Sequence, residues 1–232
     1  MKYKFLVSTI FVLTFLFGYA EAQIKKLNNS KIDLGQAIIE SVTIGTQVWM
    51  KKNLDVDHYR NGDPIPQVTD STAWVNYTSG AWCYYNNDPA NGAKYGKLYN
   101  WYATNDPRGL APPGWRVASN EEWSTLVSAT APANGNGSLY SGIKLKEAGT
   151  SHWTSPNTGA SNESGFTALP GGYKSYPGTN FDGIGTVGYW WTSSETGGTI
   201  YAYRRELYST STMTMANHIN KSVGCSVRCI KD

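Results

Sequence analysis

The sequence lacks the short motifs that most often identify an enzyme or a metal protein. It has three histidines, His58, His152 and His218, and none of them forms a pair at metal-ligand spacing. It contains no His-Glu-x-x-His and no Cys-x-x-Cys, which are typical of zinc sites, and no Gly-x-Ser-x-Gly, which presents a nucleophilic serine. The sequence therefore predicts no catalytic residue, no metal site and no cofactor.

Charge is also scarce: 16% of the residues are charged and the formal net charge is +3. The basic residues occur as scattered pairs, at 25–26, 51–52 and 204–205, and form no patch in the sequence. Affinity for nucleic acid depends on many clustered contacts to phosphates. Nucleic acid is therefore not a predicted partner.

Only the N-terminus carries a long hydrophobic run. Lys2 and Lys4 precede an apolar stretch over residues 5–17, and Ala-Glu-Ala at 20–22 is typical of a signal-peptide cleavage site. The stretch is shorter than the about 20 residues that span a bilayer. We predict a signal peptide over residues 1–22 and no integral membrane segment after its cleavage. The protein is expected in the periplasm, on the cell surface or outside the cell.

Cysteine is rare, with Cys83, Cys225 and Cys229 making an odd number. Export permits disulfides. On one strand, the four steps from Cys225 to Cys229 span about 13 Å at about 3.3 Å each, whereas a disulfide needs Cα atoms within about 7 Å. Any intramolecular bridge is therefore predicted to use Cys83, which leaves one thiol over.

Aromatic residues are abundant, with 9 Trp and 16 Tyr beside 24 Gly. Trp and Tyr combine a large apolar face with one polar group. Most of these rings are expected to fill the core of a loop-rich domain, and an exposed one would suit contact with a sugar or a peptide.

Residues 23–41 are polar and are predicted to form an N-terminal arm, followed by one domain over 42–232. Alternation around Gly45 predicts a hairpin over 42–50, and a strand is expected at 81–85. Leu98, Trp101 and Tyr102 at i, i+3 and i+4 predict a first short helix. A capping box of Ser119 and Glu122 predicts the start of a second.

The rest of the chain is expected to contain a long ordered loop and then a small sheet. Residues 131–188 are rich in Gly, Asn, Ser, Thr and Pro, but they include aromatic residues that would fix such a loop. Strands are expected at 189–193, 200–207, 213–215 and 225–230. This order predicts an α+β fold.

Five blocks of sequence, in order, resemble one known family. They are YGKLYNWYA at 95–103, PGWRV at 113–117 with Glu122-Trp123, NESGFTALPGGY at 162–173, YWWTSSE at 189–195 and SVRCIKD at 226–232. The chain is similar to the Fibrobacter succinogenes major paralogous domain, a family of bacterial envelope and secreted proteins. The resemblance implies a C-type-lectin-like fold. Many members carry Cys where this chain has Ala111, so the disulfide pairing of those members cannot be carried over to this chain.

The resemblance and the composition favour a non-catalytic binding domain, which would contact an extracellular glycan or protein. Two alternatives remain. The first is a copper enzyme of the formylglycine-generating type, which these blocks also resemble, with Cys225 and Cys229 as ligands and a protein as substrate. The second is a structural envelope protein. The candidate ligand-binding residues, all placed in or near loops, are Asn157, Asn162, Glu163, Trp190, Trp191, Glu195, Tyr203 and Arg204. Because neighbouring strand residues face opposite ways, one ring of Trp190 and Trp191 is expected to be exposed.

Overall fold

The computed structural model describes residues 39–132, 137–177, 180–198 and 200–232. The predicted signal peptide and nearly all of the predicted N-terminal arm lie outside these residues. The residues from Glu40 to Asp232 form one unit. Within the described ranges, no helix is both long enough and apolar enough to cross a membrane.

A four-stranded antiparallel sheet joins the two ends of this unit, in the order β1-β2-β12-β5. Its strands are β1 (Ser41–Ile44), β2 (Gln47–Met50), β12 (Cys229–Lys231) and β5 (Trp115–Val117). The hairpin predicted over 42–50 is confirmed. Its turn contains Gly45 with φ of 60°, a left-handed conformation that glycine adopts readily.

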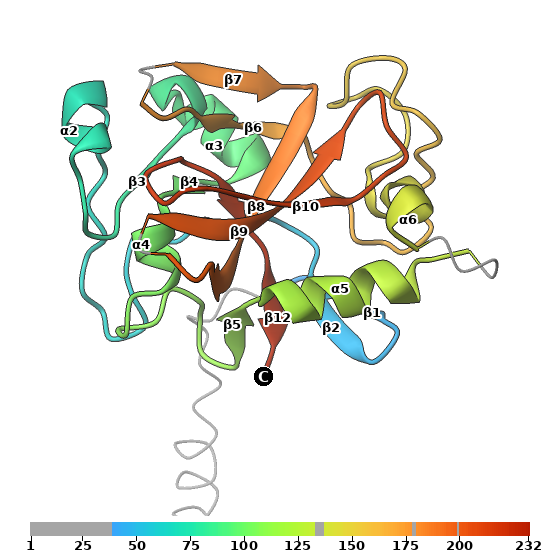
Figure 1. Cartoon of the computed structure of the whole chain (residues 1–232), viewed down its shortest axis with the longest axis horizontal. Helices are drawn as coiled ribbons and strands as arrows, with labels where there is room; N and C mark the ends of the chain where they lie inside the picture. The colour runs from blue at the N-terminus through green and yellow to red at the C-terminus, as the bar shows by residue number, and fades with distance from the viewer. Residues whose placement is uncertain (1–38, 133–136, 178–179, 199) are drawn as a thin grey trace, which may run out of the picture. The chain divides into compact units, whose positions relative to one another are not determined.

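A larger sheet has the order β10-β9-β8-β6-β7 (Figure 1). The short strand β11 pairs with β8 in parallel. Its strands are β6 (Gly171–Lys174), β7 (Phe181–Ile184), β8 (Val187–Glu195), β9 (Tyr201–Tyr208), β10 (Met215–Asn220) and β11 (Ser226–Val227). The strand expected at 225–230 is broken, because β11 and β12 join different sheets. The strand expected at 213–215 is β10, displaced towards the C-terminus.

The helices are short, and their starts depend on capping side chains. α5 (Asn120–Ala129) begins at the predicted capping box, in which Ser119 and Glu122 each bond the other's backbone N–H. The first predicted helix is reduced to one turn, α4 (Trp101–Thr104), because Asn100 caps it and Leu98 belongs to a strand. The remaining elements are α2 (Ser71–Val75), β3 (Trp82–Cys83), η1 (Tyr85–Asn87), α3 (Pro89–Tyr95), β4 (Leu98–Tyr99) and α6 (Gly137–Leu145).

The core is built from aromatic rings, as the composition predicted. Trp49, Trp123, Phe166 and Trp190 belong to one buried cluster. The Trp49 and Trp123 ring centroids lie 5.1 Å apart, edge to face, and the Phe166 ring meets both at similar distances. α5 contributes Trp123 and lies across β8 and β9 (Figure 1). The protein is therefore a mixed α+β domain with few helices and an aromatic core.

Candidate functional site

Both tryptophans of the predicted site are buried. Trp190 and Trp191 are 0% exposed, so the expectation that one ring reaches solvent was wrong. They do point to opposite faces of β8, but both faces are covered. The Trp190 indole N–H donates to Asn53 Oδ1 at 2.8 Å, and that of Trp191 donates to the Tyr99 carbonyl at 2.9 Å. These rings are core residues and offer no ligand surface.

Arg204 is also buried, at the centre of a polar network on the large sheet. Its Nε donates to Glu206 at 2.7 Å, and its guanidinium lies 3.9 Å from the Tyr189 ring centroid. The Tyr208 hydroxyl donates to the same carboxylate at 2.6 Å and bonds the Tyr189 hydroxyl at 2.9 Å. Burial, with Glu206 beside it, raises the pKa of Tyr208 well above its ordinary value. The network joins β8 to β9, and Arg204 and Glu206 are too deeply buried for ligand contact.

The loop candidates mostly stabilise turns. Asn157 is 5% exposed and its amide donates to the Gly149 carbonyl at 2.6 Å. The Asn162 side-chain oxygen accepts from the Thr167 backbone N–H at 2.9 Å. Both asparagines have positive φ, a conformation that asparagine tolerates better than most residues. Glu163 is exposed.

Glu195 and Tyr203 lie on another part of the surface, around β8, β9 and β10. Glu195 is exposed and forms an ion pair with Lys221. Tyr203 is half-buried, and its ring meets His218 edge-on at 6.4 Å. Tyr201, 43% exposed, contacts the same imidazole at 5.9 Å. The eight predicted residues therefore do not form one site.

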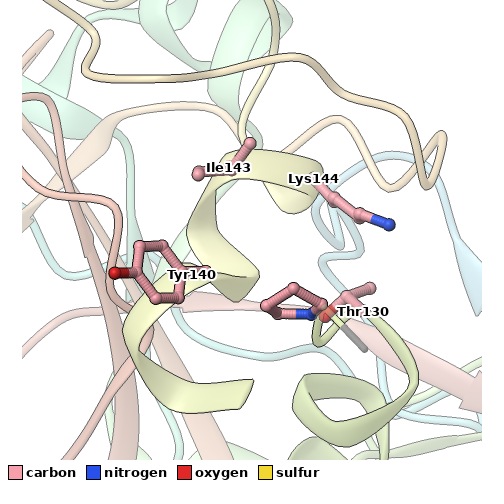
Figure 2. Close-up of a pocket in the computed structure, with 5 residues that line it drawn as sticks. Thr130, Tyr140, Ile143 and Lys144 are labelled. Carbon is pink, nitrogen blue, oxygen red and sulfur yellow. The ribbon is translucent and has the colours of Figure 1, made fainter. Parts of the chain in front are cut away.

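An exposed tyrosine on α6 forms a better candidate. Leu139 and Tyr140 are 40% and 41% exposed, and Tyr140 lines two shallow hollows. The first, of about 190 Å³, is lined by Thr130, Pro132, Tyr140, Ile143 and Lys144 (Figure 2). The second, of about 280 Å³, is lined by Leu139, Tyr140, Thr158, Thr210, Ser211, Thr212 and Met213. We call these residues together the Tyr140 surface.

Close contact between α6 and the loop before β10 shapes this surface. A Cβ on Gly142 would lie 2.7 Å from the carbonyl oxygen of Thr212 and 2.9 Å from that of Met213. The helix can approach the loop this closely because glycine has no side chain. The hydroxyl of Ser141 donates to that of Thr214 at 2.7 Å. These contacts fix one wall of the second hollow relative to Tyr140.

Lys146 holds the loops around the second hollow from inside the protein. Its side chain is fully buried, and its ammonium donates to the carbonyls of Thr158 at 3.1 Å, Tyr208 at 3.1 Å and Ser211 at 2.8 Å. Thr158 and Ser211 line the hollow. Burial lowers the pKa of Lys146 to about 8. The buried ammonium thus positions two segments of the surface that are distant in sequence.

The match to known sequences covers both α6 and these loops. Residues 42–231 match the Fibrobacter succinogenes major domain. The chain belongs to this family. The resemblance drawn from the five sequence blocks is therefore confirmed. No curated protein and no solved structure matches the chain.

In this family member the three cysteines are free and buried. The predicted bridge through Cys83 is not formed. Cys83 pairs with Leu98 on β4, and Cys225 pairs with Tyr99 from the other side of that strand. Neighbouring strands are about 4.8 Å apart, so the Cα atoms of these two cysteines are about 10 Å apart, beyond the range of a disulfide. Burial raises the pKa of each thiol to about 12.

The structure also separates the two cysteines of the copper alternative. Cys225 precedes β11 of the larger sheet, whereas Cys229 belongs to β12 of the four-stranded sheet and pairs with Val117. Within the part of the chain that the structure describes, no group of three or more His, Cys, Asp or Glu residues could hold a metal ion.

The Tyr140 surface was not predicted, because α6 lies within residues 131–188, which were expected to form a loop. α6 contains Gly137 and Gly142, and glycine is a poor helix former. The available signal was the i, i+4 pair of Leu139 and Ile143. That pair is weak evidence in a segment so rich in glycine and serine.

Proposed function

We propose that this member of the Fibrobacter succinogenes major domain family is an exported, non-catalytic binding domain that contacts a glycan through the Tyr140 surface. The observation that carries the proposal is the exposed Tyr140 ring with a hollow on either side. The N-terminal signal pattern supports export.

The chemistry of the surface suits a saccharide. The C–H face of a sugar ring is apolar and can stack on an aromatic ring, while its hydroxyls need polar partners. Tyr140 supplies the ring, and Thr158 and Thr210 supply hydroxyls in the second hollow. Because Tyr140 lines both hollows, it can contact one sugar unit while neighbouring units occupy the spaces beside it. A linear oligosaccharide fits this arrangement better than a single monosaccharide.

The first hollow has a different character. It combines apolar side chains with Lys144, whose ammonium lies 3.3 Å from the exposed carboxylate of Glu163. Exposed ion pairs of this kind contribute little to stability. Lys144 and Glu163 can therefore exchange their mutual contact for a ligand hydroxyl. This places one predicted site residue, Glu163, at the margin of the surface.

We also propose that the fold is C-type-lectin-like, on the basis of short helices followed by irregular loops and an antiparallel sheet. In such folds a binding surface on loops and a short helix is held by the sheet beneath it, consistent with the general location of binding residues on loops. The copper-enzyme alternative gains no supporting observation, because Cys225 and Cys229 enter different sheets.

A glycan array with the purified protein, followed by calorimetry on the best ligand, tests the proposal. Tyr140→Ala is expected to weaken binding about tenfold or more, the loss typical of a central aromatic contact. Tyr201→Ala is the matched control, since this tyrosine is equally exposed but lies on β9. Its affinity should match that of the wild type.

Three outcomes would overturn the assignment. If no glycan on the array binds, the proposal that the ligand is a saccharide is wrong. If wild type and Tyr140→Ala bind with equal affinity, the Tyr140 surface is not the binding site. Loss of binding in Tyr201→Ala alone would move the site to the β9–β10 hairpin.

A further inference from the structure

A third hollow, of about 260 Å³, lies beside the loop that joins α4 to β5, since Gly109, Leu110 and Ala111 of that loop line it. Two guanidinium groups line it, those of Arg60 and Arg116, together with the hydroxyl-bearing residues Thr104 and Ser193. None of these residues belongs to the Tyr140 surface. Two cationic side chains beside hydroxyl groups form a donor-rich lining.

The two arginines differ in how their charge is balanced. Arg116 is neutralised, since its guanidinium lies 2.5 Å from Glu122 and 3.4 Å from Asp232. Arg60 has no carboxylate within 4.0 Å in the described ranges. Instead its Nε donates to the Ala111 carbonyl at 3.1 Å, and its Nη2 donates to the Trp115 carbonyl at 2.5 Å.

Those backbone contacts orient the Arg60 guanidinium and leave part of it available. Its Nη1 has no protein acceptor in the described structure, and the Ser193 hydroxyl has none either. A guanidinium fixed in one orientation loses little conformational freedom on binding, and its planar N–H groups match carboxylate and sulfate oxygens. Arg108, the next arginine along the chain, is already paired with Asp63 and Asp106.

We propose that this Arg60 hollow binds a single oxyanion group, a carboxylate or a sulfate such as acidic saccharides carry. Arg60 Nη1 donates to the oxyanion, and the Ser193 hydroxyl donates a second bond. The charge of Arg116 is cancelled by its two carboxylates, so it shapes the wall without adding net attraction. The proposal is independent of the Tyr140 surface.

Nuclear magnetic resonance of isotope-labelled protein tests it without any substitution. Sodium glucuronate and sodium sulfate are titrated separately, with sodium chloride at equal ionic strength as the baseline. The Arg60 Nε–H and Ser193 amide signals should move together and saturate, with a dissociation constant of about 1–10 mM for so small a ligand. Saturation by one anion alone identifies its group as the ligand, and saturation by both supports a general oxyanion site.

Two variants assign the effect to Arg60. Arg60→Gln removes the charge and should weaken binding about tenfold or more, because charge-assisted hydrogen bonds are the strong ones. Arg108→Gln is the matched control and should bind as the wild type does. Shifts that never saturate with either anion, or equal affinity in Arg60→Gln, would overturn the proposal. If Arg60→Gln does not fold, the titration of the wild-type protein still shows whether the hollow binds an oxyanion.

Discussion

Gly142→Ala tests whether the close contact between α6 and the loop before β10 is a structural requirement. In a helix interior alanine is favoured over glycine by about 0.8–1.0 kcal/mol, so an unobstructed helix would gain stability. Here the new Cβ would meet two backbone carbonyl oxygens, of Thr212 and Met213, at 2.7 and 2.9 Å. Backbone atoms cannot rotate away, and overpacking costs about 1–3 kcal/mol. The expected net effect is a loss of about 0–2 kcal/mol in the free energy of unfolding.

Denaturant unfolding of the purified protein measures this difference. Gly137→Ala, in the first turn of the same helix, is the matched control, because the nearest atom to its Cβ is the side-chain carbon of Ala131 at 3.3 Å. The control should be neutral or slightly more stable. Gly142→Ala should also reduce glycan affinity, since the helix and the loop must move apart. A Gly142→Ala protein about 1 kcal/mol more stable than the wild type would refute the reasoning, because only the propensity gain would remain.

Three further predictions concern the rest of the domain. Ser119→Ala removes the α5 cap and should lower the free energy of unfolding by about 0.5–2 kcal/mol; an unchanged denaturation midpoint would contradict it. The lowered pKa of Lys146, about 8, means that the unfolded chain holds more protons above that pH. Wild type should therefore gain stability relative to Lys146→Met from pH 8 to 10, whereas a constant difference would argue against a buried ammonium. Cys83, Cys225 and Cys229 should resist a thiol reagent in native protein and all react once it is denatured without reductant; fewer than three reacting thiols would reveal a disulfide.

Local signals in the sequence were reliable where the interaction itself is local. The hairpin over 42–50 depends on a turn at Gly45, and α5 depends on Ser119 and Glu122 three residues apart. Spacing misled at Leu98, because Asn100 caps the helix two residues later and leaves Leu98 in a strand. In all three cases the deciding contact lies within a few residues, but at Leu98 the Asn100 cap set the start of the helix and the apolar spacing did not.

Tertiary contacts determine α6 and the burial of Trp190 and Trp191, and no local pattern in the sequence encodes these contacts. α6 is glycine-rich, and the contact of Gly142 with Thr212 and Met213 accounts for its place in the fold. Alternation on β8 predicted one exposed tryptophan, but alternation separates buried from exposed residues only where one face of a sheet meets water. The large sheet is covered on both faces at Trp190 and Trp191.

The place of β12 has a consequence for biosynthesis. This strand lies between β2 and β5 in its sheet, so residues 229–231 connect strands made much earlier in translation. The ribosome must synthesise residues 229–231 before the four-stranded sheet can close. Non-local pairing of this kind is slow to form. Until β12 emerges, β5 lacks the strand it pairs with, so this sheet closes only after the strands of the larger sheet have been made.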